Sequence, residues 1–143
     1  MTFPEISDLP SPGHTRELFD LAGNVALVTG GASGLCKAIA WGLACHGADL
    51  VLVDRDAAAV SACADEMAAA TGRRVLGCKA DVSEEREVAR VVTAATDAFG
   101  RVDILLNGAG HNIRKLLLDY SQAEFDSLLH VHVRGAFLFC RAV

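Results

Sequence analysis

A glycine-rich turn and the aspartate found twenty residues after its last glycine have the residue types of a nucleotide site. The turn, residues 29–34, directly follows the apolar run 25–28, and Asp54 ends a second apolar run. Glycines allow a tight strand-to-helix turn whose backbone N–H groups approach a pyrophosphate at the helix N-terminus. A carboxylate at Asp54 can accept hydrogen bonds from both ribose hydroxyls of an adenosine and would repel a 2′-phosphate. These residues predict a nucleotide-binding site. The alternative is a structural turn with a solvated aspartate.

Cysteine and histidine spacings argue against a metal centre. The cysteines are odd in number, form no Cys-x-x-Cys pair and stand at positions 36, 45, 63, 78 and 140. Free thiols in a reducing compartment, and hence a cytoplasmic protein, are the natural interpretation. His130 and His132 are two residues apart, so on a helix they point to nearly opposite sides. We therefore expect no metal site.

Composition excludes several classes of protein. The chain has 143 residues, of which 52% are hydrophobic and 22% charged, as in one soluble globular domain. No apolar run approaches the roughly 18 residues of a membrane helix. The net charge of −5 and the lack of a basic block argue against nucleic-acid binding. Residues 1–20 hold all three prolines and no apolar core, so we expect a flexible arm rather than a secretory signal.

Beyond that arm, strand and helix patterns alternate. Strands are predicted at 25–28, 49–54, 74–79 and 102–107, and two helices at 35–46 and 56–71. A third helix is predicted from an N-cap at Ser83 to Gly100. A fourth is predicted from the Ser121–Glu124 capping box to the end of the chain. Such alternation predicts an α/β fold, a Rossmann-like doubly wound parallel sheet with helices on both faces. Four strands are fewer than the six of that fold, and the fourth would lie at an open edge. Because the last helix stops at Val143 on an apolar position, residues 21–143 look like a partial domain that has been cut.

Several motifs together resemble the short-chain dehydrogenase/reductase family over residues 19–143. Residues 29–36 are similar to its Thr-Gly-x-x-x-Gly-x-Gly cofactor motif, and residues 107–110 to its Asn-Asn-Ala-Gly motif. Asp81 and Val82 stand where that family contacts the adenine ring, and residues 125–137 resemble its next helix, which carries a catalytic asparagine. The segment 112–115 and the loop before it look most like the gluconate 5-dehydrogenase and 3-oxoacyl-carrier-protein reductase branches. The resemblance implies the NAD-binding half of an enzyme that transfers hydride between a nicotinamide cofactor and a secondary alcohol or ketone.

The resemblance also implies a role for each motif residue. The pyrophosphate would lie against Gly30, Ser33, Gly34 and Leu35, and Asp54 would hold the adenosine ribose. The adenine pocket would be lined by Asp81 and Val82. The turn beside the cofactor would be shaped by Asn107, Ala109 and Gly110. NADP-preferring members often carry arginine where this chain has Ser33, which together with Asp54 implies NAD rather than NADP.

Three residues depart from the family's pattern. Cys36 replaces the last motif glycine, so its side chain would push the helix outward or crowd the cofactor, at a typical cost of about 1–3 kcal/mol. Alternatively the fold tolerates it as a small hydrophobe, and a reactive thiol at a helix N-terminus is a third interpretation. Gly108 replaces an asparagine and predicts a looser turn. His132 replaces the catalytic asparagine and is predicted to face inward on the apolar stripe, either as a substitute proton relay or, as we favour, as a disabling change.

The catalytic Tyr-x-x-x-Lys pair of the family is missing from this sequence. The single tyrosine is Tyr120, and Glu124 stands four residues later. We therefore predict that the chain alone is inactive, with no catalytic residue of its own. Two alternatives to a truncated dehydrogenase remain. One is an NAD-binding pseudoenzyme that associates with itself or with full-length paralogues through the helix from Ser121, and the other is a gene remnant without function.

Overall fold

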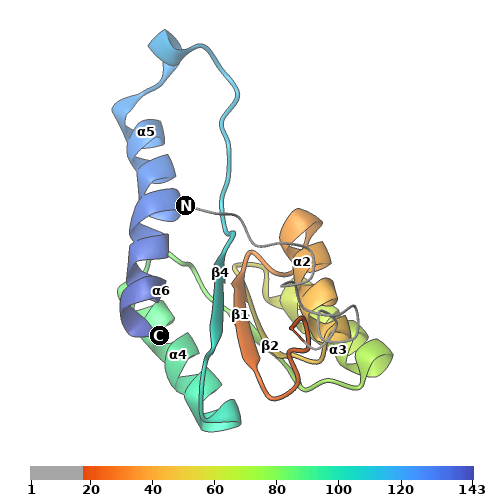
Figure 1. The fold of residues 1–143 in the computed structure, drawn as a ribbon. Coiled ribbons are helices and arrows are strands. Elements are labelled where there is room, and N and C mark those ends of the chain that lie inside the picture. Colours follow the sequence, from red (N-terminus) through yellow and green to blue (C-terminus); the bar gives the residue numbers. More distant parts are fainter. Residues whose placement is uncertain (1–17) are drawn as a thin grey trace, which may run out of the picture.

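Four parallel strands form the sheet at the centre of the fold (Figure 1). They are β1 (Val25–Thr29), β2 (Asp49–Asp54), β3 (Val75–Lys79) and β4 (Ile104–Asn107), in the order β3-β2-β1-β4. The computed structural model describes residues 18–143, so the predicted arm lies almost wholly outside the described residues. The observed order confirms the predicted α/β fold.

The strand register places the carboxyl ends of β1, β2 and β4 next to one another. Thr29 of β1 pairs with Val53 of β2 on one side and with Asn107 of β4 on the other. Among the described strands, β4 pairs only with β1, which confirms the predicted edge position. β1 is buried over its whole length, since it lies inside the sheet with helices on both faces.

Helices cover both faces of the sheet. On one side lie α2 (Gly34–Cys45) and α3 (Ala57–Thr71), which pack with the side chains around Ala26, Val28 and Leu50. On the other lie α4 (Glu85–Phe99) and α6 (Ala136–Ala142), which pack around Leu27, Val51 and Phe139. Figure 1 shows α5 (Gln122–Leu129) extending the line of α6 beyond the carboxyl end of β4.

Helix α3 follows the capping rules at both ends, and α4 follows them only at its C-terminus. The Asp56 side chain accepts a hydrogen bond from the Ala59 N–H at 3.0 Å, and α3 and α4 each end at a left-handed glycine, Gly72 and Gly100. The predicted cap of α4 is wrong, because Glu84 and not Ser83 occupies the N-cap position. The Ser83 hydroxyl instead donates to Asp81 Oδ1 at 2.7 Å, so a local turn wins over the helix cap.

The last helix is not the single α-helix that the sequence pattern predicts. A π-helical segment, His130–Gly135, separates α5 from α6, and a short 3-10 turn, Leu117–Asp119, precedes α5. A π segment widens the helix and shifts the phase of every later side chain. The predicted stripe is only partly buried: Phe139, after the π segment, is inaccessible, whereas Phe125 and Leu129, before it, are exposed.

Candidate functional site

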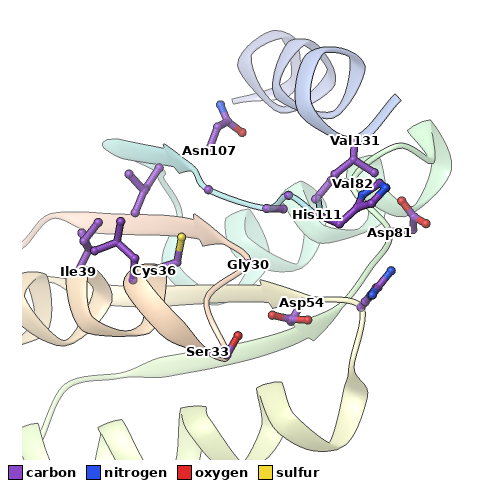
Figure 2. A pocket seen from close by; sticks show the side chains of 16 residues that line it. Gly30, Ser33, Cys36, Ile39, Asp54, Asp81, Val82, Asn107, His111 and Val131 are labelled. Carbon is purple, nitrogen blue, oxygen red and sulfur yellow. The ribbon is translucent and has the colours of Figure 1, made fainter. Parts of the chain in front are cut away.

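A cavity of about 620 Å³ opens where β1, β2 and β4 end (Figure 2). Its size lies within the range of small-molecule and cofactor sites. Nine of the ten residues predicted to bind a cofactor line it, namely Gly30, Ser33, Leu35, Asp54, Asp81, Val82, Asn107, Ala109 and Gly110. The tenth, Gly34, is not in the lining. It begins α2 with φ +55°, a conformation that favours glycine.

The N-terminus of α2 forms one wall of the cavity. Ser33 is its N-cap residue, but the serine side chain makes no capping hydrogen bond. The N–H groups of a first helical turn have no acceptor within the helix and attract anions. Because Ser33, Leu35 and Cys36 all line the cavity, this wall can hold a phosphate group.

Gly30 allows the glycine turn to approach the turn after β4. It has φ +70°, and a Cβ at this position would lie only 3.0 Å from the Cα of Ala109. No side chain fits there without moving the backbone. The two turns thus form a cradle in which the backbone is directly accessible to a ligand.

Asp54 projects into the cavity from the end of β2 (Figure 2). One carboxylate oxygen accepts from the Ala32 N–H at 3.3 Å and the other from the Asp56 N–H at 3.2 Å. Each carboxylate oxygen has two acceptor positions, so the group can still accept hydrogen bonds from a ligand's hydroxyls. The cation Arg55 stands next to Asp54 in the lining of the cavity.

Asp81 and Val82 lie near Asp54 at the same end of the cavity (Figure 2). The Ser83 hydroxyl and the Ser83 N–H both donate to Asp81 Oδ1, at 2.7 and 2.9 Å. The hydroxyl hydrogen bond is the largest cause that holds the pKa of the Asp81 carboxyl below its ordinary value. Asp81 is therefore an ionised acceptor at neutral pH, next to the buried apolar side chain of Val82.

Thr29 holds the turn after β4 in place. Its Oγ1 accepts from the N–H groups of Gly108 at 3.0 Å and Ala109 at 3.2 Å, and its hydroxyl donates to the Leu106 carbonyl at 3.4 Å. Thr29 is buried, so these bonds are shielded from water. Thr29 thus restrains the turn that was predicted to be loose because of Gly108, and this role of Thr29 was not predicted from the sequence.

The Cys36 side chain is partly buried and packs against the core between the sheet and helices α2 and α3, around Ala26, Val28 and Leu50. Figure 2 shows the sulfur directed from α2 toward the end of β4. Burial and, second, the Asp54 carboxylate raise the pKa of the Cys36 thiol. Of the three interpretations of Cys36, a small hydrophobic side chain that the fold tolerates is therefore the best supported. The raised thiol pKa argues against a thiolate nucleophile.

The inward, buried position predicted for His132 is wrong. His132 lies in the π segment and is solvent-exposed as a residue, because the wider helix shifts its direction. Its ring still contacts the turn after β4, where His132 Nε2 lies 2.8 Å from the His111 carbonyl oxygen. The same Nε2 atom lies 3.3 Å from the His111 backbone nitrogen, so it donates to the carbonyl in one tautomer and accepts from the N–H in the other.

Five lining residues besides Cys36 and Gly108 were not predicted, namely Ile39, Arg55, Leu106, His111 and Val131. A sequence signal existed for four. Ile39 is one helical turn after Leu35, and three others each adjoin a predicted residue, namely Arg55, Leu106 and His111. Val131 enters through the fold of the π segment, which no local pattern indicated.

The part of the chain that the structure describes holds neither a candidate metal centre nor a membrane span. Within residues 18–143, no group of three or more histidine, cysteine, aspartate or glutamate side chains is placed to hold a metal ion. No helix of that part is both long and apolar enough to cross a membrane. All five cysteines are free.

Comparison with known proteins gives consistent matches. The family model described as short chain dehydrogenase matches residues 24–143. A (2S)-[(R)-hydroxy(phenyl)methyl]succinyl-CoA dehydrogenase subunit, BbsD, of Thauera aromatica is 44% identical over 83% of this chain and 48% of its own length. The 2-dehydro-3-deoxy-D-gluconate 5-dehydrogenase of Dickeya dadantii is 35% identical over 87% of this chain and 48% of its own length.

Solved structures match over similar shares. The 3-ketoacyl-(acyl-carrier-protein) reductase of Brucella melitensis, complexed with NADH, has a TM-score of 0.79 and 40% identity over 85% of this chain and 49% of that chain. A short chain dehydrogenase/reductase of Burkholderia phymatum in complex with NAD has a TM-score of 0.82 and 35% identity over 86% of this chain and 43% of that chain. L-sorbose reductase of Gluconobacter frateurii, complexed with NADPH, has a TM-score of 0.84 and 31% identity over 87% of this chain and 48% of that chain. The chain spans about half the length of the relatives that it matches.

Proposed function

The chain belongs to the short chain dehydrogenase family, and from that premise we propose that its cavity binds a nicotinamide dinucleotide, NAD(H) in preference to NADP(H). One observation carries the proposal. The glycine turn, Asp54 and the Asp81–Val82 pair, which are far apart in sequence, line one cavity at the carboxyl ends of parallel strands. Open α/β sheets bind ligands in such crevices.

Each residue has a physical role in this proposal. The first-turn amides after Ser33 bind the pyrophosphate, and Gly30 keeps that approach free of side chains. Asp54 accepts from the ribose hydroxyls, and the ionised Asp81 accepts from the adenine amino group while Val82 packs on the ring. Asn107, Ala109 and Gly110 shape the opposite end. Gly34 acts indirectly, by starting α2 in a left-handed conformation.

Two residues support NAD over NADP. The Asp54 carboxylate would repel a 2′-phosphate, and Ser33 supplies no cation to hold one. Arg55 also lines the cavity and works against this preference. Because Asp54 itself would face the ribose, we expect its repulsion to dominate. Structures of relatives contain NAD, NADH or NADPH, so the preference belongs to this chain's own residues.

The reaction that we propose for the intact protein is hydride transfer between the cofactor and a secondary alcohol or ketone, a sugar acid or an acyl thioester for example. NAD(H), when bound, supplies the hydride acceptor or donor. The 143 residues contain no Tyr-x-x-x-Lys, and Tyr120 donates its hydroxyl hydrogen to the Ile113 carbonyl outside the cavity lining. We therefore expect these residues alone to bind cofactor without turnover.

Calorimetric titration with NAD and NADP tests this function. Wild-type protein is expected to bind NAD in the micromolar range and NADP at least about tenfold more weakly, a difference of about 1.4 kcal/mol. Asp54→Ala should weaken NAD binding and narrow the gap to NADP. Asp65→Ala changes an exposed carboxylate of α3 that lies outside the cavity lining, and serves as the matched control. Absence of NAD binding by folded protein would refute the proposal.

A second candidate function is association with another subunit of the same family. The observation that favours it is a row of exposed apolar side chains spaced four residues apart along α5, the π segment and α6, namely Phe125, Leu129, Val133 and Phe137. Rows of large exposed apolar side chains mark interaction sites. We propose that this surface, the α5–α6 row, pairs with a second copy or with a full-length paralogue. The proposed NAD site and this surface are compatible in one subunit.

A further inference from the structure

The Cys36 side chain of α2 fits against the turn after β4 because residue 108 of that turn is glycine and has no side chain. A Cβ built on Gly108 would lie 2.1 Å from Cys36 Sγ but 3.6 Å from Cys36 Cβ. The first distance is far inside van der Waals contact, and the second is an ordinary contact. The sulfur atom of Cys36 therefore occupies the space that any side chain at position 108 would need.

The backbone does not explain why position 108 is glycine. Among the described glycines, those with positive φ are at positions 23, 30, 34, 47, 72 and 100, so Gly108 adopts a conformation open to other residues. A Cβ there would also lie 3.2 Å from the Thr29 carbonyl oxygen, which is tight but within the reach of a small shift. Contact with Cys36 Sγ is thus the main constraint on residue 108.

Both residues line the cavity, so their fit affects the ligand site as well as the fold. Figure 2 shows Cys36 and Asn107 at one end of the cavity and Asp54 and Asp81 at the other. A side chain at position 108 would force the sulfur off its site, and the space beside it is the cavity. We propose that Cys36 and Gly108 form a matched pair that sets the width of the cavity at the Asn107 end. This inference rests on the proposed function, because it concerns the same dinucleotide site.

The matched pair predicts non-additive effects of substitution. Gly108→Ala alone is expected to weaken NAD binding about tenfold, as displacement of a well-packed side chain typically does. Cys36→Ala removes only the sulfur atom and leaves the ordinary 3.6 Å contact between two Cβ atoms. The Cys36→Ala/Gly108→Ala double variant should therefore regain NAD affinity to within about threefold of Cys36→Ala, the remainder being the Thr29 contact.

A comparison of ligands separates cavity width from general damage. AMP would occupy the Asp54 and Asp81 end and place its phosphate on the first-turn amides of α2, without reaching the Asn107 end. Gly108→Ala should therefore change AMP affinity by less than about twofold while NAD affinity falls. Gly42→Ala is the control for adding a methyl group to a glycine. Gly42 lies in α2, a Cβ there would meet nothing within 4 Å, and it is not part of the cavity lining.

The experiment measures NAD and AMP affinity by calorimetry, together with the melting temperature, for wild type, the two single variants, the double variant and Gly42→Ala.

Recovery of NAD affinity in the double variant supports the matched pair. A double variant no better than Gly108→Ala, or equal loss of AMP and NAD affinity, overturns it. If Gly108→Ala does not fold, a folded double variant supports the steric match and an unfolded one overturns it. If wild type binds neither ligand, the proposed function fails, and recovery of the melting temperature alone then decides for or against the pair.

Discussion

His132 Nε2 lies 2.8 Å from the carbonyl oxygen of His111, and the same imidazole covers the face of Gly110. A Cβ on Gly110 would lie only 2.4 Å from His132 Cε1, so the ring fills the space of a side chain at that position. The π segment is thereby tied to the turn after β4. Because Gly110 and His111 line the cavity, the histidine ring supports one end of the candidate dinucleotide site.

His132→Ala should loosen this turn. We expect a loss of about 1 kcal/mol in stability, the usual net contribution of one hydrogen bond, and a few-fold loss of NAD affinity. Thermal unfolding and calorimetry measure both. His130→Ala alters a histidine of the same π segment that is exposed, and it should leave both values nearly unchanged. Equal effects of the two substitutions would contradict the supporting role of His132.

Bound NAD should protect Cys36 from alkylation. The raised pKa of the Cys36 thiol leaves little thiolate at neutral pH, so iodoacetamide is expected to react slowly even without ligand. At a free NAD concentration ten times Kd, the rate at Cys36 should fall about tenfold. Peptide-resolved mass spectrometry gives the rate at each cysteine. Cys45, exposed on the same helix and outside the lining, should show no protection. Equal rates at Cys36 with and without NAD would place the ligand elsewhere.

Acid should destabilise the start of α5 through Glu124. The Lys115 ammonium, 2.6 Å away, and the Ser121 N–H lower the pKa of Glu124 to about 2. Because the folded pKa lies below the unfolded value of about 4.3, this stabilisation is complete above pH 4.3 and is lost as the pH falls toward 2. Hydrogen exchange of α5 amides should therefore rise across that window, and Glu124→Gln should flatten the rise. Asp126→Asn, on the same helix, is the control, and an unchanged profile in Glu124→Gln would contradict the assignment.

The α5–α6 row should mediate self-association. Leu129→Glu and Phe137→Glu place a charge on side chains that are 43% and 57% exposed, so the monomer fold should survive while any oligomer dissociates. Sedimentation velocity at tens of micromolar protein measures the change. Leu118→Glu, at a residue that is 97% exposed in the 3-10 turn, is the matched control. A wild-type protein that sediments as a monomer, or an oligomer unaffected by both substitutions, would count against this surface.

Local patterns predicted most of the fold because they reported burial directly. β1 and β2 read as apolar runs since both faces of each strand are covered, and the Ser121–Glu124 capping box forms as predicted. Gly77 lies inside β3, where glycine ordinarily weakens a strand. In the structure, a Cβ on Gly77 would lie 2.9 Å from the Val60 carbonyl, so glycine allows α3 to pack closely on the strand.

The errors have both local and long-range causes. Ser83 was predicted as a cap from its neighbours, but Asp81 offered its hydroxyl a nearer acceptor. The π segment changed the direction of His132, and a uniform helical period cannot show that change. From the sequence, Cys36 and Gly108 are two separate departures from the family's pattern. Their contact is visible only when α2 and the turn after β4 are placed together.

Mapping the amide signals of the ¹⁵N-labelled 143-residue chain during a titration with NAD tests the central claim most directly. We predict that the largest shift changes fall on residues 30–36, 54–55, 81–82 and 107–111, and that they saturate together with a single Kd. These are the segments that line the cavity. No shift changes at millimolar NAD, or changes concentrated on α3 or on the α5–α6 row, would contradict the dinucleotide site.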